Sequence, residues 1–288
     1  MPRSTNAPTL LKLVVVVTLL LPGLLTVSAC RQSDSQGGGQ SADTQQTRQP
    51  VSPNVPAPAI EPLSSFRPIL YPREEDPFAA GTAFAVKIGE HDPIILTAYH
   101  LFGPDGGVSY QMVAEMIPSF LDHVEYIDLT KEDNPLTRPF ARSTRVLVLP
   151  GATVGTDGTR PPGDIVAFWL DGHTDLSIPL LRLADQPPLE GEPVWMLARV
   201  INRPADQTMH RAVVNFVSDG ELQYRFDESG MDITATSGAP IVNHKGEVVG
   251  INIAGGTDGT GFYGFANPVN RFRAVLYQAI ADATAAGG

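Results

Sequence analysis

The sequence predicts an all-β protein that ends in one α-helix. Short β-prone runs recur along the chain, and turn residues separate them. The 27 glycines and 26 prolines together make up about 18% of the 288 residues, which is typical of a fold with many turns. A single apolar stripe at helical spacing lies near the end of the chain. These three observations predict a β-sandwich or a β-barrel architecture with a C-terminal helix.

The expected strands begin with a hairpin. Thr82–Ile88 and Ile94–Ala98 are β-prone, and the turn-forming stretch Gly89–Pro93 separates them. The other expected strands are Thr144–Leu149, Ile165–Leu170, Val194–Ala198, Ala212–Val217, Leu222–Phe226, Pro240–Val242, Val248–Ile253 and Gly261–Ala266.

The helical pattern begins after Asn267-Pro268, which resembles a helix cap followed by a proline in the first turn. Apolar residues then recur at the spacing of one helix face. They are Phe272, Val275, Leu276, Ala279 and Ile280. A second helix is expected at Val108–Ile117.

Composition excludes several classes of function. The formal net charge is −11, so the chain lacks the basic surface that nucleic-acid binding requires. One cysteine excludes internal disulfides and thiolate metal clusters. The sequence contains no Gly-rich nucleotide loop and no His-Glu-x-x-His motif. We therefore expect no metal and no cofactor.

The N-terminus has the pattern of an export signal. Leu13–Leu21 is apolar and too short for a comfortable membrane span. Val27-Ser28-Ala29-Cys30 resembles the lipobox of bacterial lipoproteins. The resemblance implies a signal peptide over residues 1–29, cleavage before Cys30, and lipid such as palmitate on its sulfur and new amino group. An ordinary signal peptide with an incidental cysteine and an uncleaved anchor are the alternatives.

A polar linker follows the signal. Residues 30–62 are rich in Gln, Ser, Gly and Pro and cannot bury enough apolar surface to offset the entropy of ordering. We expect them to form a disordered tether, with a folded domain over residues 63–288. The protein is then exported and lipid-anchored at a membrane surface of the bacterial cell envelope.

Three short segments carry residues suited to nucleophilic catalysis. Each has an ordinary structural interpretation when taken alone: His100 as a surface or core histidine, Asp164 as a turn residue, and Ser237 as part of a turn. The segments are Gly81–Val86 with Ile95–His100, then Gly163–Phe168, and finally Thr236–Val242 with Gly246–Ile251.

Taken together, in the order His–Asp–Ser, these segments resemble the chymotrypsin/trypsin-like serine proteases of the bacterial, disulfide-free type. The resemblance covers about Phe78–Ile280 and implies two six-stranded β-barrels, a cleft between them and a C-terminal helix. It assigns His100 as the general base, Asp164 as the group that orients the imidazole, and Ser237 as the nucleophile.

The same resemblance assigns the oxyanion hole to the backbone N–H groups of Ala235 and Ser237. Ala235 replaces the usual glycine, so a positive φ there would cost about 1–2 kcal/mol. Thr236 replaces an aspartate that pairs with a new N-terminus in animal enzymes. Loop order must therefore come from local packing. Tyr99 replaces a small residue and has to find room near the cleft.

The primary substrate pocket is assigned by offset from the serine. Met231 is expected at its floor, and Ile253, Gly255 and Gly261 in its walls. With no acid at the floor, the pocket is expected to reject Lys and Arg and to accept a medium or large apolar side chain.

Three functions remain open at this point. The first is a membrane-tethered serine endopeptidase that hydrolyses protein or peptide substrates through an acyl-enzyme. The second is a catalytically silent binding or scaffold module with the same fold. The third is an esterase that uses the same triad, although the Gly-x-Ser-x-Gly elbow of α/β-hydrolases is absent around Ser237.

Overall fold

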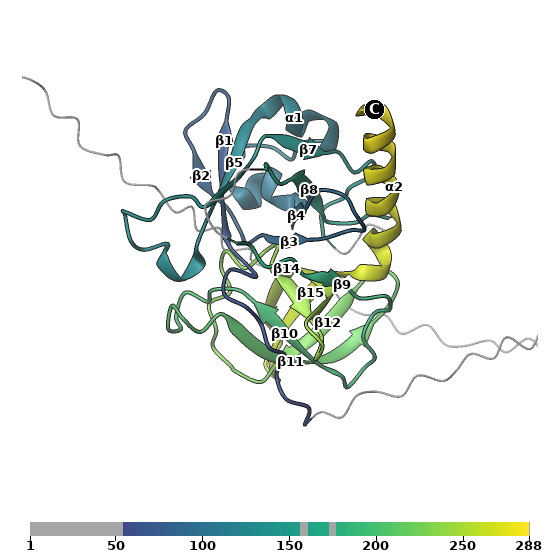
Figure 1. Cartoon of the computed structure of the whole chain (residues 1–288). Coiled ribbons are helices and arrows are strands. Elements are labelled where there is room, and N and C mark those ends of the chain that lie inside the picture. Colours follow the sequence, from purple (N-terminus) through teal and green to yellow (C-terminus); the bar gives the residue numbers. More distant parts are fainter. Residues whose placement is uncertain (1–53, 156–160, 173–176, 288) are drawn as a thin grey trace, which may run out of the picture.

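The computed structural model describes residues 54–155, 161–172 and 177–287, and within them the fold is mostly β and ends in a long helix (Figure 1). The strands are β1 (Arg67–Pro72), β2 (Phe78–Ala79), β3 (Phe84–Val86), β4 (Ile94–Thr97), β5 (Leu121–Ile127), β6 (Ala141–Ser143), β7 (Arg145–Leu147), β8 (Val166–Trp169), β9 (Arg182–Leu183), β10 (Pro193–Leu197), β11 (Met209–Val217), β12 (Leu222–Phe226), β13 (Pro240–Val242), β14 (Glu247–Thr257) and β15 (Phe262–Pro268). The helical segments are the 3₁₀ turns η1 (Tyr99–Phe102), η2 (Pro104–Gly106), η3 (Ala114–Met116) and η4 (Leu129–Lys131), and the helices α1 (Ile117–Phe120) and α2 (Val269–Gly287).

The second half of the chain forms a closed barrel. Its strands follow the order β13-β10-β11-β12-β15-β14, and the pairing of β13 with β14 closes the ring of six. Strand β9 adds to β14 in parallel. Alternate residues of β11 and β12 point inward, which is the pattern of a barrel wall with one buried face.

The first half contains two four-stranded sheets, in the orders β2-β1-β5-β6 and β3-β4-β8-β7. A bridge between Phe66 and Ala83 connects them. The predicted hairpin is confirmed, because β3 and β4 pair with Phe84 opposite Leu96. With the closed barrel and the terminal helix, this confirms the predicted double-barrel fold class, although the first half is split into two sheets rather than built as one six-stranded sheet.

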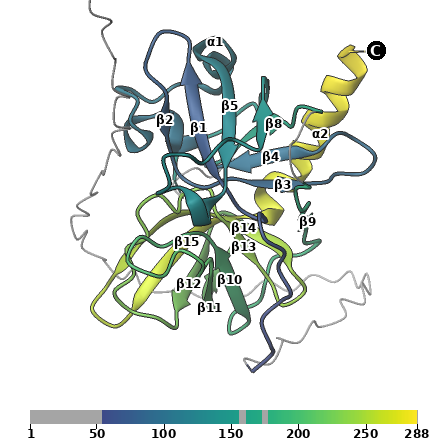
Figure 2. The same cartoon turned by 60° about the vertical axis from the view of Figure 1, so that its left-hand side comes forward.

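Helix α2 joins the two halves. It packs against β14 and β15 of the second barrel and against β7 of the first half, and both views show it along one side of the molecule (Figures 1 and 2). Phe272, Leu276 and Ile280 of the predicted stripe are buried in the larger hydrophobic core, which also contains Leu147 of β7 and Ile251 of β14. No helix within the described ranges is long and apolar enough to cross a membrane.

The prediction of a helix at Val108–Ile117 is wrong. Residues 108–113 form no regular secondary structure, and only η3 and the first residue of α1 are helical at the end of the segment. The backbone N–H groups of Val108 and Met112 donate to the carbonyls of Gly103 and Phe102, so the segment's hydrogen bonds go to a neighbouring loop. Val108, Met112, Ala114 and Ile117 are buried, whereas Tyr110, Val113 and Met116 are exposed.

The described residues begin at Asn54, before the predicted domain boundary at residue 63. Val55 and Ile60, which the sequence places in the tether, pack against the larger core. The predicted signal peptide and Cys30 lie outside the described residues. The signal peptide, the lipid attachment and the domain boundaries therefore stay predictions.

Candidate active site

A cleft of about 470 Å³ lies between the two halves. The first half contributes His100, which lies in η1 directly after β4, and Asp164, which lies just before β8. The second barrel contributes Ser237, just before β13. The three residues predicted to be catalytic therefore line the same cleft, each at the end of a strand or close to one.

His100 and Asp164 form a buried pair. The Nδ1 atom of His100 lies 2.8 Å from Oδ2 of Asp164, and Asp164 is fully buried. The backbone N–H groups of Tyr99 and His100 donate to Oδ1 at 2.7 and 3.0 Å. The N–H of Gly155 donates to Oδ2 at 2.8 Å. These four contacts fix the carboxylate and hold the imidazole with Nδ1 toward it.

The electrostatics of the pair favour a charged imidazole. Burial alone would lower the pKa of His100, because the imidazolium loses solvation. The charge of Asp164 and its hydrogen bond outweigh this effect and raise the pKa above the usual value of 6.5. An imidazolium that forms during reaction is therefore stabilised in place.

Activity is expected to depend on pH through this group. A general base must be neutral, so kcat/KM should fall as pH drops through the pKa of His100. Because that pKa is raised, the midpoint of the acidic limb is expected above pH 6.5. A pH profile of kcat/KM on a peptide substrate measures it, and a midpoint below 6.5 would contradict the assigned pairing.

Ser237 lies in the segment Ile233–Gly238, here called the oxyanion loop. The carbonyl oxygen of Ser237 accepts from the N–H of Thr82 at 2.7 Å. The N–H of Gly238 donates to the carbonyl of Asn252 at 2.7 Å. Among the described residues, no hydrogen bond joins the Ser237 hydroxyl to His100. Such contacts are often long without substrate and shorten when substrate binds.

Ala235 has a φ of +66°. This value lies in the left-handed region, which is strained for a residue with a Cβ atom. In the described part of the chain, the N–H groups of Ala235 and Ser237 donate to no acceptor. Both groups are therefore free of acceptors among the described residues, and their assignment to an oxyanion hole stays a prediction.

The second barrel holds the oxyanion loop through buried side chains that the sequence analysis missed. Asn252 donates to the carbonyl and hydroxyl oxygens of Thr236 at 3.2 and 3.0 Å. Tyr224 donates to Oδ1 of Asn252 at 2.6 Å. Asn252 is the one polar residue inside the apolar run Val248–Ile253, which is the sequence signal that identifies it.

Two of the four residues predicted to form the substrate pocket line the cleft. Ile253 and Gly255 line it, together with Ile233, whose side chain packs directly over Gly255. Met231 is buried in the hydrophobic core, and Gly261 lies against the Arg225 side chain; neither lines the cleft. Their roles in the pocket stay predictions. Tyr99 is buried beside the site, and its hydroxyl donates to the carbonyl of Met112.

No group of three or more His, Cys, Asp or Glu side chains suited to a metal ion occurs among the residues that the structure describes.

Comparisons with known proteins agree with this description. A family model described as a trypsin-like peptidase domain matches residues 81–251. Kallikrein-related peptidase 10 is similar in structure, with a TM-score of 0.51 and 13% identity over 78% of this chain and 98% of that one. The serine endoprotease from Yersinia pestis has a TM-score of 0.48 and 15% identity, over 82% of this chain and 69% of that one. The Rv3671c protease from M. tuberculosis, in its active form, has a TM-score of 0.46 and 16% identity, over 82% and 91%. No curated protein matches the chain.

A double β-barrel with a histidine–aspartate pair and a serine on the cleft between its halves defines the trypsin-like class of proteins. At these identities, the structural likeness concerns the fold. The family match covers more than half of the 288 residues. The chain belongs to the trypsin-like peptidase domain family.

Proposed function

We propose that this protein is a serine endopeptidase that cleaves peptide bonds through His100, Asp164 and Ser237 and an acyl-enzyme. The observation that carries the proposal is the buried 2.8 Å contact between His100 and Asp164, on the cleft that Ser237 also lines.

The mechanism follows from the roles of these groups. As the Ser237 oxygen bonds to the substrate carbonyl carbon, His100 takes the hydroxyl proton, and Asp164 stabilises the imidazolium. The N–H groups of Ala235 and Ser237 bind the negative oxygen of the tetrahedral intermediate. His100 then gives its proton to the leaving amine as the C–N bond breaks. Water releases the acyl group by the same steps.

The substrate is a protein or peptide. Among the residues that line the cleft with Ser237, Ile233, Ile253 and Gly255 present apolar surface and carry no charge. We therefore propose that it accepts an apolar side chain before the cleaved bond and disfavours Lys and Arg.

Labelling with a fluorophosphonate probe tests the proposal. The probe phosphonylates a serine, with loss of fluoride, only where a base and an oxyanion hole activate it, so we expect a single label on Ser237. Ser237→Ala should remove the label, while Ser218→Ala, which changes an exposed turn, should keep it. A folded protein that takes no label and cleaves no peptide would overturn the proposal in favour of a silent binding module.

We also propose that the peptidase is held at a membrane by lipid on Cys30. The Val27-Ser28-Ala29-Cys30 sequence supports this attachment. Cys30→Ser is expected to release the protein from the membrane fraction. Unchanged membrane association, or an unmodified N-terminus by mass spectrometry, would refute it.

A further inference from the structure

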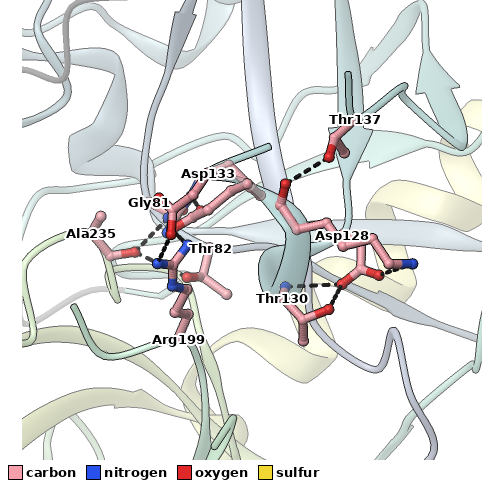
Figure 3. A network of polar contacts seen from close by, with 11 residues as sticks. Gly81, Thr82, Asp128, Thr130, Asp133, Thr137, Arg199 and Ala235 are labelled. Carbon is pink, nitrogen blue, oxygen red and sulfur yellow. Dashed lines mark hydrogen bonds and ion pairs between the residues drawn. The ribbon is translucent and has the colours of Figure 1, made fainter. Parts of the chain in front are cut away.

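A buried arginine of the first half reaches the oxyanion loop of the second. Arg67, at the start of β1, is 4% exposed. Its Nη1 atom donates to the carbonyl of Gly81 and, at 2.8 Å, to the carbonyl of Ala235. Figure 3 labels Gly81 and Ala235, the two residues that accept from it. The hydroxyl of Thr82 donates to the same Ala235 carbonyl at 3.0 Å. The residue with the strained φ is therefore clamped from across the cleft.

The charge that holds Arg67 comes from a different segment. Oε2 of Glu132 lies 2.7 Å from Nε of Arg67. Oε1 of Glu132 lies 2.9 Å from Nη1 of Arg199 in the second barrel. Arg199 also pairs with Asp133. A buried arginine needs a counter-charge, because desolvation of an unpaired guanidinium is costly. Glu132 is thus the group that keeps Arg67 in place.

Glu132 belongs to the segment 128–137, which connects β5 to β6 and is largely exposed. The segment holds itself together: Lys131 pairs with Asp128, and the Thr137 hydroxyl donates to the carbonyl of Lys131. Leu136 at its tip is 82% exposed. A solvent-facing segment therefore connects through two side chains to the catalytic cleft.

We propose that Arg67 is a positioning residue for the oxyanion loop, and that Glu132 on segment 128–137 sets how firmly Arg67 holds it. The inference rests on the proposed function, because it assigns this contact to the reaction at Ser237. In the structure, Arg67 binds the Ala235 carbonyl while Ala235 has a φ of +66°, and we infer that this contact is lost when the loop relaxes. A contact made in one loop conformation and not in the other lowers the free energy of the first, so Arg67 stabilises the conformation in which Ala235 has a positive φ.

The clamp acts where zymogen-type enzymes use an aspartate before the serine. Thr236 carries no charge, so it cannot order the loop by an ion pair. Arg67 supplies the charge from the other half, and its planar fork contacts Glu132 and two carbonyls at once. Lysine has a single ammonium group and cannot make the same set of contacts.

Two variants weaken the clamp without removing any group on the cleft. Glu132→Gln removes the counter-charge, and Arg67→Lys removes the fork. Both are expected to lower kcat and the rate of fluorophosphonate labelling by about tenfold, with KM changed less than about twofold. The low-field NMR signal of the His100 Nδ1 proton should be unchanged, because the pair with Asp164 is untouched. Glu228→Gln breaks a comparable 2.8 Å pair with Arg203 and is expected to change none of these values.

A double variant separates positioning from a general structural role. Glycine adopts positive φ without cost. Adding Ala235→Gly to Arg67→Gln should therefore raise the labelling rate above that of Arg67→Gln alone. Two results would overturn the inference. One is an unchanged kcat in folded Glu132→Gln and Arg67→Lys, and the other is a labelling rate of the double variant no higher than that of Arg67→Gln.

Backbone amide hydrogen exchange of the oxyanion loop tests the role of Arg67 separately from catalysis at Ser237. If the wild-type protein takes no label, the proposed function fails, but residues 233–238 should still exchange faster in Glu132→Gln than in Glu228→Gln. If the wild-type protein is labelled and the exchange rates are equal in the two variants, the inference fails while the function stands.

Discussion

Replacing Asp164 with asparagine is expected to lower kcat by about 10⁴-fold. The carboxylate accepts four N–H groups, two at each oxygen. An asparagine offers only one acceptor oxygen. If that oxygen keeps the N–H groups of Tyr99 and His100, the new amide nitrogen faces Gly155 N–H and forces His100 to accept at Nδ1. The proton then lies on Nε2, which can no longer take one from Ser237.

The measurement is kcat on a peptide substrate, with thermal unfolding to verify that the variant is folded. Asp171→Asn is the matched control, because Asp171 follows β8 at its other end and accepts from the N–H and hydroxyl of Thr144 in an exposed turn. We expect its kcat to remain near that of the wild type. An Asp164→Asn loss no greater than that of the control would exclude Asp164 from the triad.

Replacing Gly238 with alanine is expected to lower the free energy of unfolding by about 3 kcal/mol or more. Gly238 has a φ of +88°, which disfavours any residue with a Cβ atom. A Cβ there would also overlap the carbonyl of Thr82 and the hydroxyl of Thr97, and would lie 3.0 Å from the backbone nitrogen of Ala98. These atoms lie along the β3–β4 hairpin of the first half, so the second barrel would have to move away from it.

Denaturant unfolding measures this loss. Gly256→Ala is the control, because a Cβ at Gly256 meets nothing within 4 Å. Its effect should stay within about 0.5 kcal/mol. Equal stabilities of the two variants would mean that the close approach of the halves at Gly238 contributes nothing to the folded state. The Gly238 variant should also lose labelling of Ser237, whose backbone would shift with its neighbour.

The sequence predicts those parts of the fold whose pattern is local. The β3–β4 hairpin, β13 and the stripe of α2 all follow from residues close together in the chain. Strand β5 is not predicted, because Asp122, His123 and Glu125 interrupt its apolar residues. It buries mainly one face, and its polar residues face outward.

The residues of the candidate site also differ in whether a local sequence pattern predicts them. His100, Asp164 and Ser237 were found because each lies in a short recognisable segment. Arg67 was not, because its partners are distant in sequence: Ala235 is 168 residues away. Only the folded chain brings the two together. A sequence offers no local reason to separate this arginine from one on the surface.

The division of the three residues between two halves has a consequence for the cell that makes this protein. A chain in which only the first half has folded holds the proposed base, His100, and its carboxylate but not the proposed nucleophile. A chain in which only the second barrel has folded holds the serine but no base. A hydrolase assembled in this way cannot attack its neighbours while it is still incomplete. Its proposed reactivity begins with the docking of the halves, which makes completed folding itself the safeguard against premature damage.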